Sequence, residues 1–153
     1  MKMAQKTLQT PLGKIIITAD EVGICSLDFD EDAPVCEASN GHITQLIIEL
    51  EEYFRGERKD FSVALNPKGT PFQKGVWEVL QGISYGETIS YSEEADILKH
   101  PKAVRAVANA NGKNPIPIII PCHRVIAKGG GIGGYSGGLW RKEFMLDLEQ
   151  KNR

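Results

Sequence analysis

Residues 71–112, PFQKGVWEVLQGISYGETISYSEEADILKHPKAVRAVANANG, decide the fold of this chain. Three stretches of this segment have apolar residues at helical spacing, and the short breaks SYGETI and KH separate them. Three short helices with tight connections are typical of a helix-turn-helix module. Thr70 is expected to cap the first helix, with Pro71 at its first position. The sequence therefore predicts a mainly α-helical C-terminal domain.

The third of these helices has two different faces on a helical wheel. One face is apolar and holds Val104, Val107 and Ala108. The other is basic and of low relief, and holds Lys102, Arg105, Ala106 and Asn109. Because only Arg105 is prominent on this face, it could approach DNA closely without discriminating many bases. The alternative is an ordinary amphipathic helix with Arg105 solvated.

The N-terminal part indicates a small α/β unit. A Pro-Leu-Gly turn precedes a β-branched run in TLQTPLGKIIITAD (7–20), and GICSLDF (23–29) alternates as a second strand would. HITQLIIELEEYFRGE (42–57) has a helical repeat that ends at Gly56, and its apolar face is expected to cover the strands. NPKGTP (66–71) is the expected linker, which gives domains at 1–66 and 67–153.

Charge is distributed unevenly between these halves. Residues 1–66 carry six Lys and Arg against twelve Asp and Glu, whereas residues 67–153 carry twelve against eight. The asymmetry favours an acidic scaffold and a basic half that carries the function; the alternative is that the exposed charge only keeps the protein soluble. The first residues, MKMAQKTLQT, lack an apolar signal region and no long apolar run follows, so we expect an intracellular protein, cytoplasmic or, in a eukaryote, nuclear.

Cys122 lies in the most informative stretch, IIIPCHRV (118–125). Residues 118–120 are expected to form a buried strand, and Pro121 ends regular pairing just before the cysteine. His123 and Arg124 add positive charge that favours a thiolate. The alternative is that Cys122 is a buried structural thiol, as most free cysteines are.

His123 is the candidate base for Cys122. Neighbouring side chains on extended backbone point to opposite sides, so a water is expected to bridge the two. The base needs an acceptor to orient it, and Glu149 is the best candidate because it lies beside Met145 and Leu146 on the final helix. The alternative for Glu149 is a solvated residue near the chain end.

The loop GGGIGGYSGG (129–138) lacks the Lys-Ser/Thr pair of a phosphate-binding loop, so we expect no nucleotide cofactor. Tyr135 and Ser136 between its glycines suit a lid over a ligand; a plain surface loop is the alternative. The three cysteines form neither a disulfide framework nor a zinc set, so we expect no metal.

PCHRV (121–125), preceded by NPIPIIIP and followed by YSGG, resembles the active-site signature of the O6-alkylguanine-DNA alkyltransferases. The similarity continues through GETISYSEEADILKHPKAVRAVANANGKNP (86–115) and covers residues 71–149 almost continuously. It implies a winged-helix-like helix-turn-helix domain after an α/β ribonuclease-H-like domain, which TPLGKIIITAD matches more loosely. The family's zinc ligands in that domain have no matching set beside Cys25.

The resemblance also implies roles for individual residues. Cys122 would accept the alkyl group, His123 with a water would deprotonate it, and Glu149 would hold His123. Arg105 would replace the flipped base in the stack, with the helix in the minor groove, while Tyr91 would help to extrude the nucleotide and protonate the departing guanine. Asn114 would order the turn near Cys122. The base pocket would be lined by Val125, Tyr135 and Ser136.

The implied reaction is direct reversal of O6-alkylguanine damage in double-stranded DNA, with O4-alkylthymine as a further candidate substrate. A thioether has no easy route back to a thiol, so each molecule, expected to be a monomer, would react once. Two other classes remain open: a sequence-specific regulator in which Cys122 is structural, and a hydrolase that uses Cys122, His123 and Glu149 with turnover.

Overall fold

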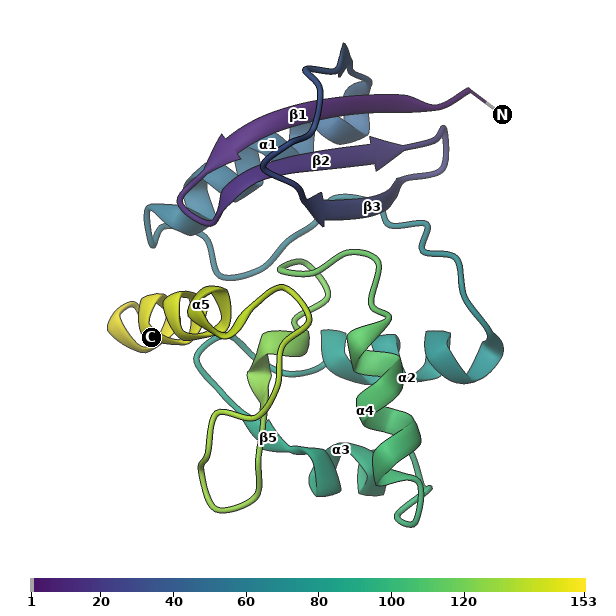
Figure 1. The fold of residues 1–153 in the computed structure, drawn as a ribbon, viewed down its shortest axis with the longest axis vertical. Helices are drawn as coiled ribbons and strands as arrows, with labels where there is room; N and C mark the ends of the chain where they lie inside the picture. Colours follow the sequence, from purple (N-terminus) through teal and green to yellow (C-terminus); the bar gives the residue numbers. More distant parts are fainter. Residues whose placement is uncertain (1) are drawn as a thin grey trace. The chain divides into compact units, whose positions relative to one another are not determined.

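The computed structural model describes residues 2–153 and separates two compact units, Met1–Lys68 and Gly69–Arg153, which are described here one at a time. The N-terminal unit is a four-stranded antiparallel sheet with one helix on one of its faces (Figure 1). Along the sheet the order is β3-β2-β1-β4. The strands are β1 (Ala4–Thr10), β2 (Gly13–Ala19), β3 (Ile24–Phe29) and β4 (Glu37–Ala38), and the helix is α1 (Gly41–Phe54).

The central strand β2 explains how this unit forms its core. Its side chains alternate, with Ile15, Ile17 and Ala19 fully buried, as expected for a sheet with one covered face. Thr10 pairs with Gly13 to close the β1–β2 hairpin, so the residues before Pro11 form a strand of their own. The predicted cover of the strands by the helix is confirmed, since α1 contributes buried Ile43, Leu46 and Leu50.

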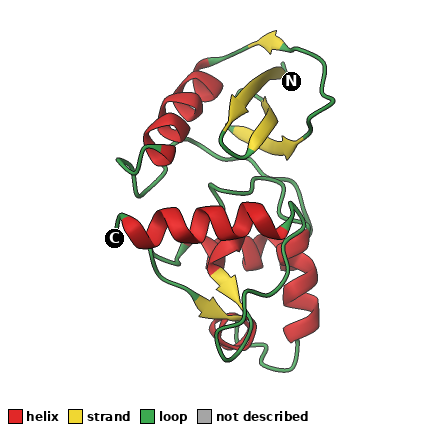
Figure 2. Ribbon diagram, turned by 60° about the vertical axis from the view of Figure 1, so that its left-hand side comes forward, coloured by secondary structure: helices red, strands yellow, loops and turns green. Residues whose placement is uncertain are grey.

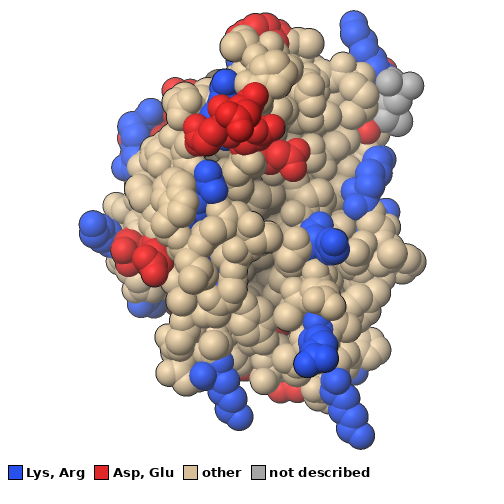
Figure 3. Space-filling model, in the orientation of Figure 1, with Lys and Arg blue, Asp and Glu red and all other residues tan. Residues whose placement is uncertain are grey.

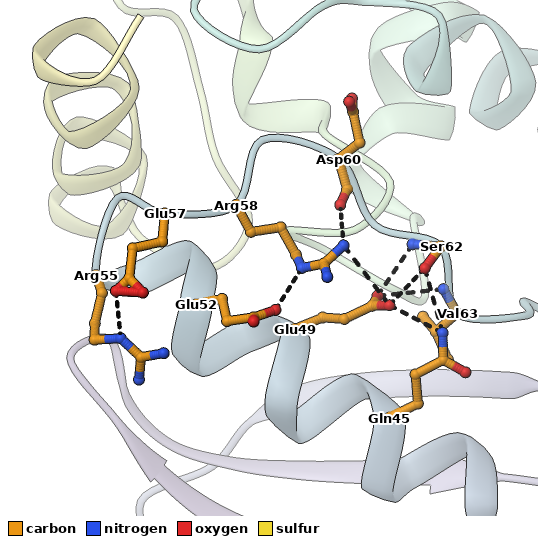
Figure 4. A network of polar contacts seen from close by, with 9 residues as sticks. All are labelled: Gln45, Glu49, Glu52, Arg55, Glu57, Arg58, Asp60, Ser62 and Val63. Carbon is orange, nitrogen blue, oxygen red and sulfur yellow. Dashed lines mark hydrogen bonds and ion pairs between the residues drawn. The ribbon is translucent and has the colours of Figure 1, made fainter.

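A buried carboxylate on α1 fastens the following loop to the helix. Glu49 is 3% exposed and accepts hydrogen bonds from Ser62 Oγ at 2.7 Å, from the backbone N–H of Ser62 at 3.1 Å and from that of Val63 at 3.2 Å. Arg58 lies at the edge of the same network (Figure 4). Burial alone would raise the pKa of Glu49, but these bonds outweigh it and lower the pKa. The network is therefore structural.

The C-terminal unit is mainly helical and contains one short pair of strands (Figure 2). Its elements are α2 (Pro71–Gln81), β5 (Ile89–Ser90), α3 (Tyr91–Ile97), α4 (Val104–Gly112), the 3₁₀ turn η1 (Cys122–Arg124), β6 (Val125–Ile126) and α5 (Leu139–Lys151). β5 and β6 pair in parallel, through Ile89 with Val125 and Ser90 with Ile126. The predicted helix-turn-helix is confirmed in α3 and α4, which pack on α2.

Capping residues set where these helices begin. The Thr70 hydroxyl accepts from Gln73 N, and the Thr70 backbone N–H donates to Gln73 Oε1 in return, so the predicted start of α2 at Pro71 is confirmed. Ser90 and Glu93 form the same reciprocal box at α3. The indole N–H of Trp77 donates to the carbonyl of Ala110 at 2.9 Å, which locks α2 against α4.

The expected strand at 118–120 was wrong. These residues are buried, but they form turns: Ile118 has a φ of 79°, and Ile120 N donates to Ile116 O at 2.9 Å. Prolines at 115, 117 and 121 lack the N–H groups that a sheet ladder needs, so the segment cannot pair as a strand.

Candidate active site

A tight turn presents Cys122. Pro121 has φ −83° and ψ 66°, and Cys122 N donates to Ile120 O at 2.8 Å, which is an inverse γ-turn. Asn114 holds this turn from the side: its Nδ2 donates to Ile120 O at 2.8 Å, and its Oδ1 accepts from Ile116 N at 3.0 Å. Cys122 therefore opens a 3₁₀ turn and does not follow a strand.

Glu149 is the centre of a buried polar cluster. It is 1% exposed, and its Oε2 lies 2.6 Å from His123 Nε2. Arg124 donates to the same carboxylate through Nε at 2.8 Å and Nη2 at 3.2 Å, and its Nη1 donates to Ile83 O at 2.6 Å. Burial would raise the pKa of Glu149, but the bonds from His123 and Arg124 outweigh it and hold the pKa at about 2. The carboxylate is charged at neutral pH.

The charge on Glu149 fixes the tautomer of His123. Because an ionised carboxylate only accepts, the hydrogen-bond network assigns the imidazole proton to Nε2. Burial lowers the pKa of His123 and keeps the ring neutral. Nδ1 then has a free lone pair and no protein partner in the described chain. This nitrogen can accept a proton.

Positive charge reaches Cys122 from a residue that the sequence analysis missed. His123 and Arg124 are committed to Glu149, so the expectation that they favour the thiolate was wrong. Burial raises the pKa of the Cys122 thiol, and the Asn114 side chain and the ammonium of Lys142 partly offset this effect. The thiol is therefore protonated in the resting protein.

Lys142 is fully buried in α5. Its Nζ donates to Val125 O at 2.6 Å and to Gly134 O at 3.0 Å, and lies 5.9 Å from the centre of the Tyr91 ring. Burial lowers its pKa to about 8. Its spacing from Met145 and Glu149, three and seven positions, puts it on the inner face of the helix with those two buried residues.

A pocket of about 370 Å³ lies beside Cys122. It is lined by Tyr91, Ala108, Asn111, Gly112, Cys122, Gly134, Tyr135 and Ser136. Tyr135 and Ser136 were predicted to line the pocket, and Tyr91 was predicted as a proton donor to the base, whereas Ala108 and Asn111 were not predicted. Val125 is not among the lining residues: its side chain is buried and its carbonyl accepts from Lys142, so it acts on the site through backbone.

The glycine-rich loop contacts Tyr91 closely. Gly134 N donates to the Tyr91 hydroxyl at 3.3 Å, and that hydroxyl lies 3.5 Å from Gly134 O. Gly133 has a φ of 76°, and a Cβ atom there would meet the Tyr91 hydroxyl at 2.9 Å. Glycine at 133 thus allows the loop to lie against the pocket.

The helix α4 carries both an exposed basic face and part of the pocket wall. Of the predicted DNA-contact residues, Arg105, Ala106 and Asn109 are exposed on α4, whereas Lys102, expected on the same helix, is exposed in the turn that precedes α4. Ala108 and Asn111, on another side of α4, line the pocket. In Figure 3, a group of acidic side chains lies over the N-terminal unit, and Lys and Arg are scattered over both units. A ligand held on the exposed face would lie next to the pocket.

Residues 2–153 show neither a cluster of metal ligands nor a helix suited to cross a membrane. No group of three or more His, Cys, Asp or Glu side chains gathers as a metal site would require within that range. None of the helices described there combines the length and apolar character needed to cross a bilayer.

A helix-turn-helix unit whose exposed helix borders a pocket with a buried cysteine defines a DNA-binding protein with a thiol placed for chemistry. Two family models divide the chain between them: the 6-O-methylguanine DNA methyltransferase ribonuclease-like domain at residues 3–67, and the DNA binding domain of the same family at residues 71–151. The chain belongs to the 6-O-methylguanine DNA methyltransferase family. The predicted family and fold class are confirmed.

Relatives match over nearly the whole chain. The methylated-DNA–protein-cysteine methyltransferase of Methanosarcina acetivorans is 44% identical, over 92% of this chain and 94% of its own. The constitutive enzyme of that name from Bacillus subtilis is 43% identical, over 94% of this chain and 93% of its own. The Mycobacterium tuberculosis OGT structure in complex with DNA has a TM-score of 0.87 at 39% identity, covering 97% of this chain and 94% of that one.

Proposed function

We propose that this protein repairs DNA by direct reversal, taking the alkyl group of O6-alkylguanine onto the sulfur of Cys122, once per molecule. One observation carries the proposal: Cys122 lies in the wall of a pocket that α4 borders, and the same helix exposes Arg105, with exposed Lys102 in the turn just before it. The names of the relatives, methylated-DNA–protein-cysteine methyltransferases, support the same reaction.

The proposed chemistry uses the residues around the pocket. The Cys122 proton passes through a water to Nδ1 of His123, and the Glu149 carboxylate stabilises the imidazolium that forms. The thiolate sulfur attacks the alkyl carbon, a sulfur–carbon bond forms, and the bond from carbon to guanine O6 breaks. Tyr91 gives a proton to the departing guanine, and the thioether remains on the protein.

DNA must deliver the base to this pocket. The O6 atom lies within the base stack, so the nucleotide has to rotate out, at a cost of about a few kcal/mol. In the proposal Arg105 takes the vacated place and offsets this cost, while Lys102, Ala106 and Asn109 lie along the minor groove. O4-alkylthymine is a further candidate substrate. The protein acts as a monomer inside the cell, without metal or nucleotide cofactor.

Intact mass spectrometry with a duplex that contains one O6-methylguanine tests the proposal. The expected result is a gain of one methyl group on Cys122 that stops at one equivalent and is absent from Cys122→Ala. An unmodified protein that binds a preferred sequence would instead make it a regulator. Continued turnover without a modified cysteine would make it a hydrolase.

A further inference from the structure

Glu94 is a buried carboxyl group that the proposed reaction does not use. It lies in α3 with no exposed surface, and its Oε1 accepts a hydrogen bond from Asn111 Nδ2 at 2.7 Å. Among the described residues, its other oxygen, Oε2, has no hydrogen-bond partner, and neither has Oδ1 of Asn111; both atoms are shielded from solvent. Two unpaired acceptors thus occur in one side-chain pair.

A proton on Glu94 accounts for both unpaired atoms. A neutral carboxylic acid has one O–H donor, and the amide of Asn111 offers one acceptor and one N–H donor. Together they can form a two-point acid–amide pair, whereas an ionised Glu94 would leave a buried negative oxygen without a donor. Burial raises the pKa of Glu94 to about 7, against the opposing hydrogen bond from Asn111.

The surroundings of Glu94 bring little other charge. The buried side chains of α2 are apolar, and α4 contributes Asn111 beside apolar neighbours. β6 contributes buried Val125.

The ionisable groups near Glu94 are few. In η1, His123 and Arg124 are hydrogen-bonded to Glu149, and the Cys122 thiol is the ionisable group that interacts electrostatically with Glu94. From α5, Lys142 interacts in turn with Cys122. The exposed charges nearest in sequence are Glu93 and Asp96 on α3 itself.

Asn111 connects this pair to the pocket, because it lines the pocket together with Cys122. We propose that Glu94 is a positioning residue: as a neutral acid it holds Asn111 in the pocket wall, and its ionisation slows alkyl transfer. This inference rests on the proposed function. Ionisation acts in two ways, since it breaks one of the two bonds to Asn111 and since the new negative charge raises the pKa of the Cys122 thiol.

The test compares single-turnover rates of the wild type, Glu94→Gln and the control Glu93→Gln on the O6-methylguanine duplex, from pH about 5.5 to 8.5. Glutamine keeps both hydrogen bonds and cannot ionise. The ratio of the Glu94→Gln rate to the wild-type rate should be constant at acidic pH and rise by about threefold to tenfold through neutrality. This is the change in rate that corresponds to the net free energy of one hydrogen bond. The Glu93→Gln ratio should stay flat, because Glu93 is exposed.

This ratio isolates Glu94 because Cys122, His123 and Lys142 titrate in both proteins. Glu94→Leu, which leaves Asn111 without its acceptor, should be slower than Glu94→Gln at every pH. A flat Glu94→Gln ratio, or a Glu94→Leu protein as fast as Glu94→Gln, overturns the inference. A wild type that gains no methyl group overturns the proposed function instead.

A readout independent of activity is the carboxyl carbon resonance of Glu94, identified as the signal missing from Glu94→Gln. Its titration midpoint is expected near the value of about 7 that burial produces. A midpoint at the ordinary value, 4.5, would show that the acid is ionised in the working protein and would refute the pairing.

Discussion

His123 Nε2 and Glu149 Oε2 lie 2.6 Å apart, with the two side chains 0% and 1% exposed, and Arg124 binds the same carboxylate. Replacing Glu149 by glutamine would leave the buried Arg124 charge without its counterion. We expect Glu149→Gln to lower the free energy of unfolding by about 3 to 5 kcal/mol in urea denaturation. Glu143→Gln, an exposed change on the same helix, should have little effect. If Glu149→Gln and Glu143→Gln unfold at the same urea concentration, the cluster does not stabilise the protein in this way.

The same pair makes stability sensitive to acid. The pKa of Glu149 is about 2 in the folded protein and 4.5 in the unfolded chain, so the unfolded state binds the proton first as pH falls. Its stabilisation is complete above pH 4.5 and is lost as pH falls toward 2. The loss should approach about 3 kcal/mol in the wild type and be absent from Glu149→Gln. Parallel stability curves for the two proteins would refute the assignment.

Position 133 should require glycine for two reasons: its backbone φ is positive, and an added Cβ has no room beside Tyr91. Gly133→Ala places a Cβ at 2.9 Å from the Tyr91 hydroxyl, on backbone with a φ of 76°. We expect a loss of about 1 to 3 kcal/mol in stability and slower alkyl transfer, since both loop and Tyr91 must move. Gly134→Ala is the matched control, because nothing lies within 4 Å of its added carbon. The prediction fails if both alanine variants behave alike.

Arg105 should matter only when the base has to leave a duplex. Arg105→Ala is expected to keep its rate with free O6-alkylated guanine and to lose about tenfold or more on duplex DNA, because nothing then fills the vacated stack. Lys74→Ala, which removes an exposed positive charge from α2, controls for general loss of DNA attraction. Equal losses on both substrates would rule out the finger role.

Lys142 should tune the Cys122 thiol. Its ammonium lowers the pKa of Cys122, so Lys142→Met should raise that pKa and shift the pH profile of thiol alkylation toward alkaline values. Peptide mass spectrometry after treatment with iodoacetamide distinguishes Cys122 from Cys25 and Cys36. Lys151→Met, an exposed change on the same helix, should leave the profile in place. If the pH profile of Cys122 alkylation is the same in Lys142→Met and in the wild type, Lys142 does not lower the pKa of Cys122.

Periodicity and capping residues predicted the helices well. α2 begins at Pro71 because Thr70 and Gln73 cap it locally, and α4 keeps Arg105 exposed because Val107 faces the core. These are local signals that a single sequence contains. The inverse γ-turn at Pro121 has the sequence pattern of a strand end, because three isoleucines favour a strand; the missing N–H donors of three nearby prolines prevent that strand from pairing.

The polar groups of the site were harder to predict than its helices. Glu149 was recognised because a carboxylate beside Met145 is unusual, and its contact with His123 follows from the fold. Lys142 and the Glu94–Asn111 pair were missed, since an exposed lysine or glutamate has the same sequence pattern as a buried one. Their partners lie on other elements. Val125 is 17 positions from Lys142 along the chain, and Asn111 is 17 positions from Glu94.

Burial of the Cys122 thiol bears on the lifetime of unused protein. Oxidants and small electrophiles attack the thiolate, and the raised pKa keeps that form scarce at neutral pH. Cys25 and Cys36 are both more accessible to solvent than Cys122. Under the proposed function, molecules that have met no lesion keep their one methyl-accepting equivalent during long storage. Repair capacity then depends on how many copies a cell holds rather than on how recently they were made.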